Sequence, residues 1–143
     1  MALDIVVTST SSDSHTWNLV FLQLLLEESG HRVISLGACV PDAVLLQTTQ
    51  QRRPDLIVIS SVNGHGRQDG LRVIRALRAC PQLAATPVVI GGKLDTIGSE
   101  GDSADVDLIA AGFNGVFTDD VAAFRQYVEL LARAGRDGRV GVG

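Results

Sequence analysis

An aspartate and a histidine lie two residues apart in the polar segment "SSDSHTWN" (residues 11–18), where an apolar run ends and a helical pattern begins. In an extended turn, this spacing places both side chains on the same side. A carboxylate beside an imidazole can hold one ring nitrogen as N–H, which leaves the other free as a base or metal ligand. Asp13 and His15 are therefore candidates for such a site. The alternative is that Asp13 caps the following helix and His15 is solvated near its first turn.

Two later segments also carry residues suited to a ligand. In "SSVNGHG" (60–66), Ser60 and Ser61 could donate hydroxyl hydrogen bonds, and Gly64 could let the backbone approach a ligand closely. An ordinary turn followed by a capped helix explains these residues equally well, and a solvated histidine explains His65.

The segment "GGKLDTIG" (91–98) opens with a double glycine directly after an apolar run. Gly91 and Gly92 leave no side chains there, which favours a flat or bulky ligand lying along the backbone. The alternative is a tight bend from strand to loop.

The elements that must position these segments alternate between strand and helix. Short apolar runs predict strands at 3–7, 32–37, 55–61, 87–92 and 116–117. Helical periodicity predicts helices at 17–29, 41–52, 71–80, 103–111 and 121–134. In the first helix, the expected buried stripe consists of Trp17, Val20, Phe21, Leu24 and Leu25.

This alternation predicts an α/β fold with a doubly wound, five-stranded parallel sheet in the flavodoxin-like order 2-1-3-4-5. We expect one domain over residues 1–134 and a flexible tail over 135–143, where apolar periodicity is lost. In such sheets, ligands bind beyond the carboxyl ends of the strands. The segments described above all follow strands at that edge.

Composition narrows the functional classes. No apolar run reaches the roughly 20 residues of a membrane span, and no basic segment precedes the first strand, so we expect a cytoplasmic protein without a membrane partner. The net charge of −4 argues against nucleic acid, and the three-residue spacing of Arg72, Arg75 and Arg78 is typical of a solvated helix face. Cys39 and Cys80 are expected to be free thiols.

Several enzyme classes are excluded by motif. The sequence has no Gly-x-x-x-x-Gly-Lys-Ser/Thr loop, no Gly-x-Ser-x-Gly elbow and no Cys-x-x-Cys pair. A phosphoacceptor receiver would need an aspartate at the end of the third strand, where Ser60 and Ser61 lie. A flavin-binding module stays open as an alternative, although its loops usually stack aromatic rings on the cofactor.

The ordered set of motifs resembles the cobalamin-binding domain family, whose fingerprint is Asp-x-His-x-x-Gly, a serine-containing segment after the third strand, and Gly-Gly after the fourth. By length and sequence motifs, the chain most resembles the small subunits of glutamate (methylaspartate) mutases. Here the family glycine after the histidine is Asn18, and the Pro-Gly-Thr after the fifth strand is Thr118-Asp119-Asp120.

The resemblance implies a base-off corrinoid with His15 as the lower cobalt ligand and Asp13 on the other ring nitrogen. The residues expected to contact the cofactor are Asp13, Ser14, His15, Thr16, Asn18, Ser60, Ser61, Val62, Gly64, Gly91, Gly92, Lys93, Phe117 and Thr118. No catalytic residue is assigned to this chain.

The same resemblance implies the cobalamin-binding subunit of an adenosylcobalamin-dependent carbon-skeleton mutase, which is an isomerase. Such a subunit is inactive without a separate, larger barrel-type subunit. Two alternatives stay open: a corrinoid carrier or sensor module, and a flavodoxin-like module that does not bind cobalamin.

Overall fold

The computed structural model describes residues 2–11, 17–61, 66–92, 101–117 and 121–142. Its elements, in chain order, are β1 (Asp4–Ser9), α1 (Trp17–Glu28), β2 (Arg32–Ser35), α2 (Asp42–Arg52), β3 (Leu56–Ser60), α3 (Gly66–Ala79), the 3-10 turn η1 (Pro81–Leu83), β4 (Val88–Gly91), α4 (Gly101–Ala111), β5 (Gly115–Phe117) and α5 (Val121–Val142).

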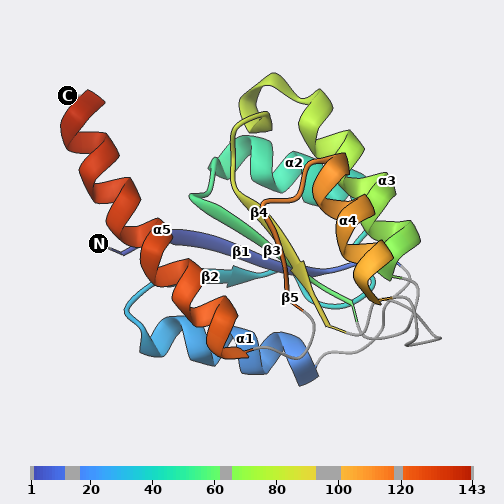
Figure 1. Ribbon diagram of the computed structural model, residues 1–143, viewed down its shortest axis with the longest axis horizontal. Coiled ribbons are helices and arrows are strands. Elements are labelled where there is room, and N and C mark those ends of the chain that lie inside the picture. The colour runs from blue at the N-terminus through green and yellow to red at the C-terminus, as the bar shows by residue number, and fades with distance from the viewer. Residues whose placement is uncertain (1, 12–16, 62–65, 93–100, 118–120, 143) are drawn as a thin grey trace.

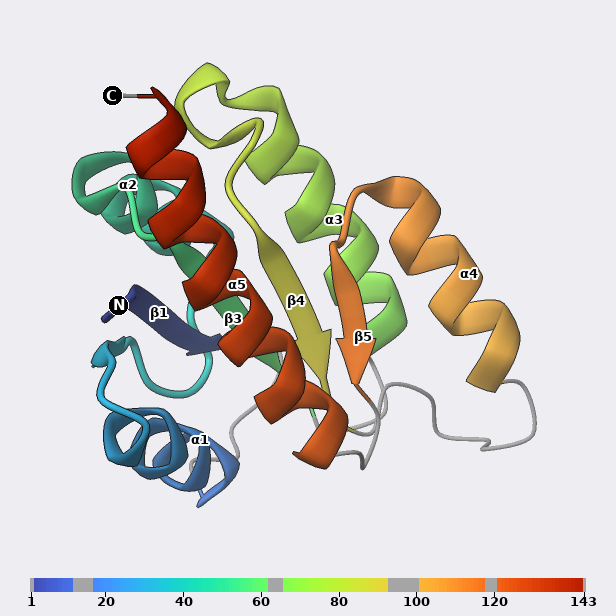
Figure 2. The ribbon, with the colours of Figure 1, turned by 60° about the vertical axis from the view of Figure 1, so that its left-hand side comes forward.

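The strands form one five-stranded sheet in the order β2-β1-β3-β4-β5, and every neighbouring pair is parallel (Figure 1). The predicted fold class and strand order are therefore confirmed. Helices α2, α3 and α4 cover one face of the sheet, and α1 and α5 cover the other (Figure 2). Helices on both faces explain why the central strands are apolar almost throughout.

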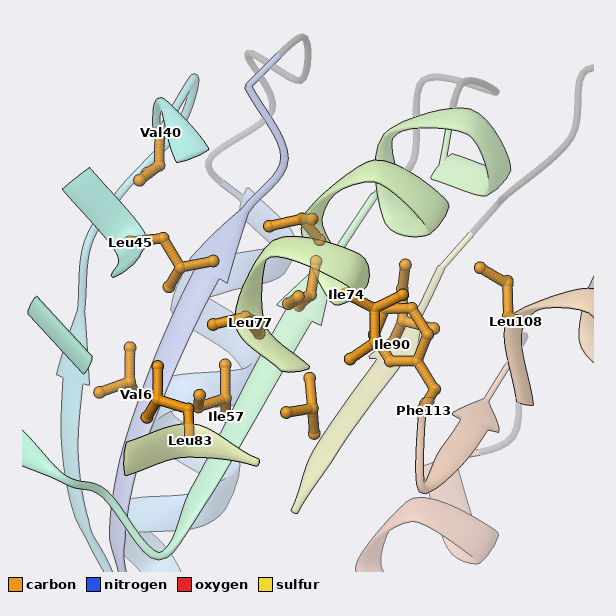
Figure 3. Packing of buried hydrophobic residues seen from close by; sticks show 13 residues of the cluster. Val6, Val40, Leu45, Ile57, Ile74, Leu77, Leu83, Ile90, Leu108 and Phe113 are labelled. Atoms are coloured by element: carbon orange, nitrogen blue, oxygen red, sulfur yellow. The ribbon is translucent and has the colours of Figure 1, made fainter. Parts of the chain in front are cut away.

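The core beneath α2, α3 and α4 is closely packed. Ile74 and Leu77 of α3 lie among side chains from the sheet, including Ile57 and Ile90, and all four are fully buried (Figure 3). Gly70 allows this approach, because a Cβ atom there would lie 2.9 Å from the Cδ1 atom of Ile90. Helix α3 is thus packed tightly against the sheet from Gly70 to Leu77.

The buried face of α1 differs from the predicted one. Val20, Phe21 and Leu24 are 47%, 39% and 57% exposed, whereas Leu19 and Leu26 are buried against the sheet. Leu25 packs against the core as predicted, but the prediction was wrong for Val20, Phe21 and Leu24. Because α1 carries apolar residues on nearly all sides, their spacing cannot identify the inner face. The exposed side chains line a groove of about 370 Å³ on the outer surface of α1.

Helix α5 continues to Val142, beyond the helix end that we expected near Ala134. It runs obliquely across the sheet, and its last turns extend past the strands (Figures 1 and 2). Phe124 and Val128 are buried on its inner side, as the apolar spacing predicts. Within the described part of the chain, no helix combines the length and the apolar character that crossing a bilayer requires.

Side chains close the amino end of the sheet. The backbone N–H of Leu3 donates to Nδ1 of His31 at 3.1 Å, and that of Asp4 donates to Oδ2 of Asp55 at 2.9 Å. Arg32 pairs with Asp4 at 2.8 Å. Burial lowers the pKa of His31, and the nearby positive amino terminus lowers it further. A neutral His31 is therefore part of this end of the fold.

Arg78 makes a second set of contacts at the amino end. Its guanidinium donates to the carbonyl oxygens of Gly112, Leu83 and Thr86 at 2.7–3.1 Å, and to Oδ1 of Asn114 at 2.8 Å. Asn114 in turn accepts from the backbone N–H of Val88.

These contacts correct the expectation of a wholly solvated arginine stripe. Arg75 is exposed as predicted, but Arg78 is half-buried and binds backbone, and Arg72 is ion-paired. Spacing alone places a side chain on a helix face, but it does not show which loop lies within reach. Cys39 and Cys80 are both free, as predicted.

Candidate functional site

Four residues form a row across the carboxyl end of the sheet. Ser9 is in register with Ser60, Ser60 with Gly91, and Gly91 with Phe117. The residues two positions earlier on β1, β3 and β4 pack under α1 and α5, so strand alternation places the row on that same face. Ser9 and Ser60 are almost fully buried. Three small residues therefore lie side by side where ligands approach such a sheet.

The β5 end of the row is aromatic. The ring of Phe117 lies 5.7 Å from that of Phe124 in an edge-to-face contact, and 5.7 Å from that of Tyr127. Burial raises the pKa of Tyr127, and its ring is packed against the apolar cluster. Helix α5 thus holds Phe117 in place and closes one side of the row.

Backbone hydrogen bonds fix this edge. Ser61 N–H donates to the carbonyl oxygen of Gly91 at 3.0 Å, and Gly92 N–H donates to that of Phe117 at 3.2 Å. Ser9 donates through both its N–H and its hydroxyl to the carbonyl oxygen of Gly37, the hydroxyl at 2.9 Å. The segments that follow β1, β3, β4 and β5 consequently start from well-defined positions.

The double glycine has a backbone cause. A Cβ atom on Gly91 would lie 2.6 Å from the carbonyl oxygen of Phe117, and Gly92 has a φ of +109°. A side chain would strain either position. The tight bend therefore accounts for both glycines without a ligand, although the bare backbone at Gly91 still forms part of the row.

Thr10 is a residue that the sequence analysis missed. It follows β1 directly and is 4% exposed, yet its hydroxyl oxygen has no hydrogen-bond partner among the described residues. A buried hydroxyl without a partner costs free energy, so it marks a place where a ligand group could satisfy it. The sequence signal was available, because Thr10 is the first residue beyond the strand and directly precedes the polar segment 11–18.

Of the predicted site residues, the structure brings together Ser60, Ser61, Gly91, Gly92 and Phe117 at the carboxyl end of the sheet. Asn18 is the second residue of α1, and the structure describes its backbone only. The predictions for Asp13, Ser14, His15, Thr16, Val62, Gly64, Lys93 and Thr118 lie outside the described residues, as does that for His65.

No metal-ligand cluster is seen in the described ranges, which do not include the Asp13–His15 pair. What the described residues provide is a row of small side chains, an aromatic wall and an unsatisfied hydroxyl. A few polar groups beside apolar and aromatic side chains are the kind of lining that small-molecule sites have.

Comparison with known proteins shows two kinds of relative among characterised sequences. The chain is 40% identical over 83 residues to the HTH-type transcriptional repressor CarA of Myxococcus xanthus. The matched stretch covers 57% of the chain and 28% of CarA. It is 26% identical over 117 residues to the glutamate mutase sigma subunit of Fusobacterium nucleatum, covering 79% of the chain and 82% of that subunit.

A cobalamin-binding protein from Desulfitobacterium hafniense has a similar structure, with a TM-score of 0.75 and 19% identity over 91% of the chain and 59% of its own length. That likeness concerns the fold. Residues 3–107, which run from the start of the sheet into α4, match the B12 binding domain family. The chain therefore belongs to the B12 binding domain family.

Proposed function

We propose that this chain is the cobalamin-binding subunit of an adenosylcobalamin-dependent carbon-skeleton mutase of the glutamate mutase type. The observation that carries the proposal is coverage: the chain matches 82% of the length of the Fusobacterium nucleatum sigma subunit, and 75% of that from Halobacterium salinarum. The Asp13-x-His15 spacing supplies the residues that this function requires.

The described residues fit a corrinoid with an extended tail. Ser9, Ser60 and Gly91 offer a row free of large side chains, and Phe117 limits it on one side. The hydroxyl of Thr10 lacks a partner in the described part of the chain and lies at the start of the segment that leads to His15. A polar group of the ligand would supply that partner.

In this proposal, His15 would hold cobalt through one ring nitrogen in place of the cofactor's own base. Asp13 would accept a hydrogen bond from the other ring nitrogen and so would fix the tautomer and the ring orientation. When bound, adenosylcobalamin supplies a weak cobalt–carbon bond as the radical source. The chain's own residues bind, orient and enclose the cofactor.

The substrate site belongs to a second chain in this proposal. A barrel of the size that carries such sites takes roughly 250 residues, whereas the described residues of this chain build the five-stranded sheet and its helices. We propose that a separate, larger subunit holds the substrate over the corrinoid, and that this chain shows no mutase activity by itself.

The CarA similarity favours a second candidate function. Over its 83 matched residues, CarA is 40% identical to this chain, compared with 26% and 27% for the two sigma subunits. The chain spans only 28% of CarA, so the matched part is one module of a regulator. The second candidate is accordingly a corrinoid-binding sensor module that acts without mutase chemistry.

Electron paramagnetic resonance of cob(II)alamin bound to the protein tests the shared step. In protein labelled with nitrogen-15 histidine, the axial nitrogen splitting should change from a triplet to a doublet. The cofactor is unlabelled and contains only nitrogen-14, so a doublet can come only from a histidine of the protein. His15→Ala should abolish the label-dependent splitting, and His65→Ala should retain it as the matched control. Splitting that does not change with the label would contradict histidine coordination.

Reconstitution with the large subunit of a glutamate mutase separates the two candidates. The mutase subunit should support conversion of glutamate to methylaspartate when both chains and adenosylcobalamin are present. A sensor module should show histidine-dependent splitting but no turnover with that partner.

A further inference from the structure

Arg72, in the second turn of α3, contacts three groups at once. Its Nε donates to Oδ2 of Asp42 at 2.7 Å, and its Nη1 donates to Oδ1 of Asp69 at 3.0 Å. Its Nη2 donates to Oγ of Ser11 at 2.9 Å and to Oδ1 of Asp42 at 3.3 Å. One guanidinium therefore uses all three of its nitrogens.

These three partners follow three neighbouring strands. Ser11 lies two residues after β1, Asp42 opens the helix that follows β2, and Asp69 lies in the first turn of the helix that follows β3. Strands β2, β1 and β3 are adjacent in the sheet. Arg72 thus joins the segments that leave the carboxyl ends of adjacent strands.

The two carboxylates hold the guanidinium in a fixed orientation. The side chain of Asp69 is only 10% exposed and that of Asp42 is 26% exposed, so part of this network is shielded from solvent. The hydrogen bonds that Arg72 donates to Asp42 and then to Asp69 raise the pKa of Arg72, which stays charged. An isolated surface pair contributes little, but a planar guanidinium gripped on two edges has few orientations left.

We propose that Arg72 is a positioning residue for the cobalt ligand. By holding the hydroxyl of Ser11, it sets the starting point of the chain segment that reaches Asp13 two residues later and His15 four residues later. Histidine coordination then requires less ordering of the backbone when cobalamin binds. This inference rests on the proposed role of His15.

The variants that test it are Arg72→Met, which removes the guanidinium, Arg72→Lys, which keeps the charge, and Ser11→Ala, which removes only the accepting hydroxyl. Arg75→Met is the matched control, because Arg75 is exposed on the same helix. A lysine cannot reach three acceptors in one plane, so we expect it to restore the effect only in part.

The first measurement needs no cofactor. Hydrogen exchange of the cofactor-free protein, read by mass spectrometry, should be faster in peptides covering residues 8–19 for Arg72→Met and Ser11→Ala. Arg75→Met should leave those peptides unchanged. Unchanged exchange in both Arg72→Met and Ser11→Ala would overturn the anchoring role, whether or not the chain binds cobalamin.

The second measurement is a titration with cob(II)alamin, using the histidine splitting as the signal. Arg72→Met and Ser11→Ala should each weaken histidine coordination by about tenfold, as losses around metal ligands typically do. Histidine coordination in the double variant should be no weaker than in Arg72→Met, because Ser11→Ala removes a contact that Arg72→Met has already broken. Wild-type coordination that persists unchanged in Arg72→Met would overturn the inference and leave the proposed function intact. Absence of histidine splitting in the wild type would overturn the proposed function and, with it, this role in cobalt coordination.

Discussion

The two ends of the sheet are built differently. At the amino end, His31, Asp55 and Arg78 bind backbone groups directly, and each strand end that they touch is closed by a specific side chain. At the carboxyl end, the row runs through two serines and a glycine, and the hydroxyl of Thr10 has no partner among the residues that the structure describes.

This difference separates stability from binding within one sheet. Parallel strands place all their carboxyl ends at one edge, where the following loops can converge on a ligand. On the face that carries the row, large side chains would occupy the space that the ligand needs, whereas the bonded guanidinium of Arg72 comes from α3, which covers the other face. We therefore expect substitutions at the amino end to change the free energy of unfolding, and those at the carboxyl end to change cobalamin binding.

The largest expected effect is at Arg78. Arg78→Met should lower the free energy of unfolding by about 3 kcal/mol, because several buried or half-buried acceptors lose a charged donor. Urea denaturation followed by circular dichroism measures this change. Arg75→Met on the same helix should cost less than about 0.5 kcal/mol. Equal losses from both variants would contradict the structural role of Arg78.

The next effect is at Gly91, which lies at the carboxyl end yet has a structural reason. Gly91→Ala should lower the free energy of unfolding by about 2 kcal/mol, because the added Cβ would meet the carbonyl oxygen of Phe117 at 2.6 Å. Thermal unfolding is the measurement. Ser60→Ala, at the neighbouring position in the row, is the comparison and should cost less. A neutral Gly91→Ala would restore the simpler interpretation of the glycine as ligand space.

A smaller effect is the pH dependence from His31. Its pKa in the folded state is lowered, so the unfolded chain takes up a proton first as the pH falls below about 6.5. The stability from neutral His31 is therefore complete above that pH and is lost as the pH falls toward the lowered folded value. We expect a loss of at most about 1 kcal/mol. Urea unfolding at pH 7.5 and pH 5.5 should show a steeper decline for the wild type than for His31→Gln.

The smallest effect should have the opposite sign. Thr10→Val replaces a buried hydroxyl without a described partner by a methyl group of similar shape, so stability should rise by up to about 1 kcal/mol. Cobalamin affinity should fall, because the polar group of the ligand loses the Thr10 hydroxyl as its hydrogen-bond partner. A loss of stability in this variant would show that the hydroxyl is already bonded in the cofactor-free protein.

Much of the fold could be predicted from sequence because its signal is local. Apolar runs identified β1, β3 and β4, and the alternation of strands with helices determined the parallel order. The inner face of α1 could not be predicted, because eight of its twelve residues are apolar and they lie on nearly all sides, which removes the periodic signal on which such predictions depend. The length of α5 was also missed, because the glycines after Ala134 favour a helix end.

The candidate site was predictable only in part. The positions of Ser60 and Gly91 after their strands follow from topology, but the pairing of Ser9 with Ser60 depends on strand register. The contact between Arg72 and Ser11 joins residues 61 positions apart, and no local pattern indicates it. Tertiary contacts of this kind appear only when the neighbouring strands are placed.

The row across the carboxyl end also has a direction. Hydroxyl groups lie at β1 and β3, bare backbone follows at β4, and aromatic carbon closes it at β5. A ligand that lies along this row meets a polar environment at one end and an apolar one at the other. Such a gradient distinguishes head from tail, so a reversed ligand would place its polar groups against the rings of Phe117 and Phe124.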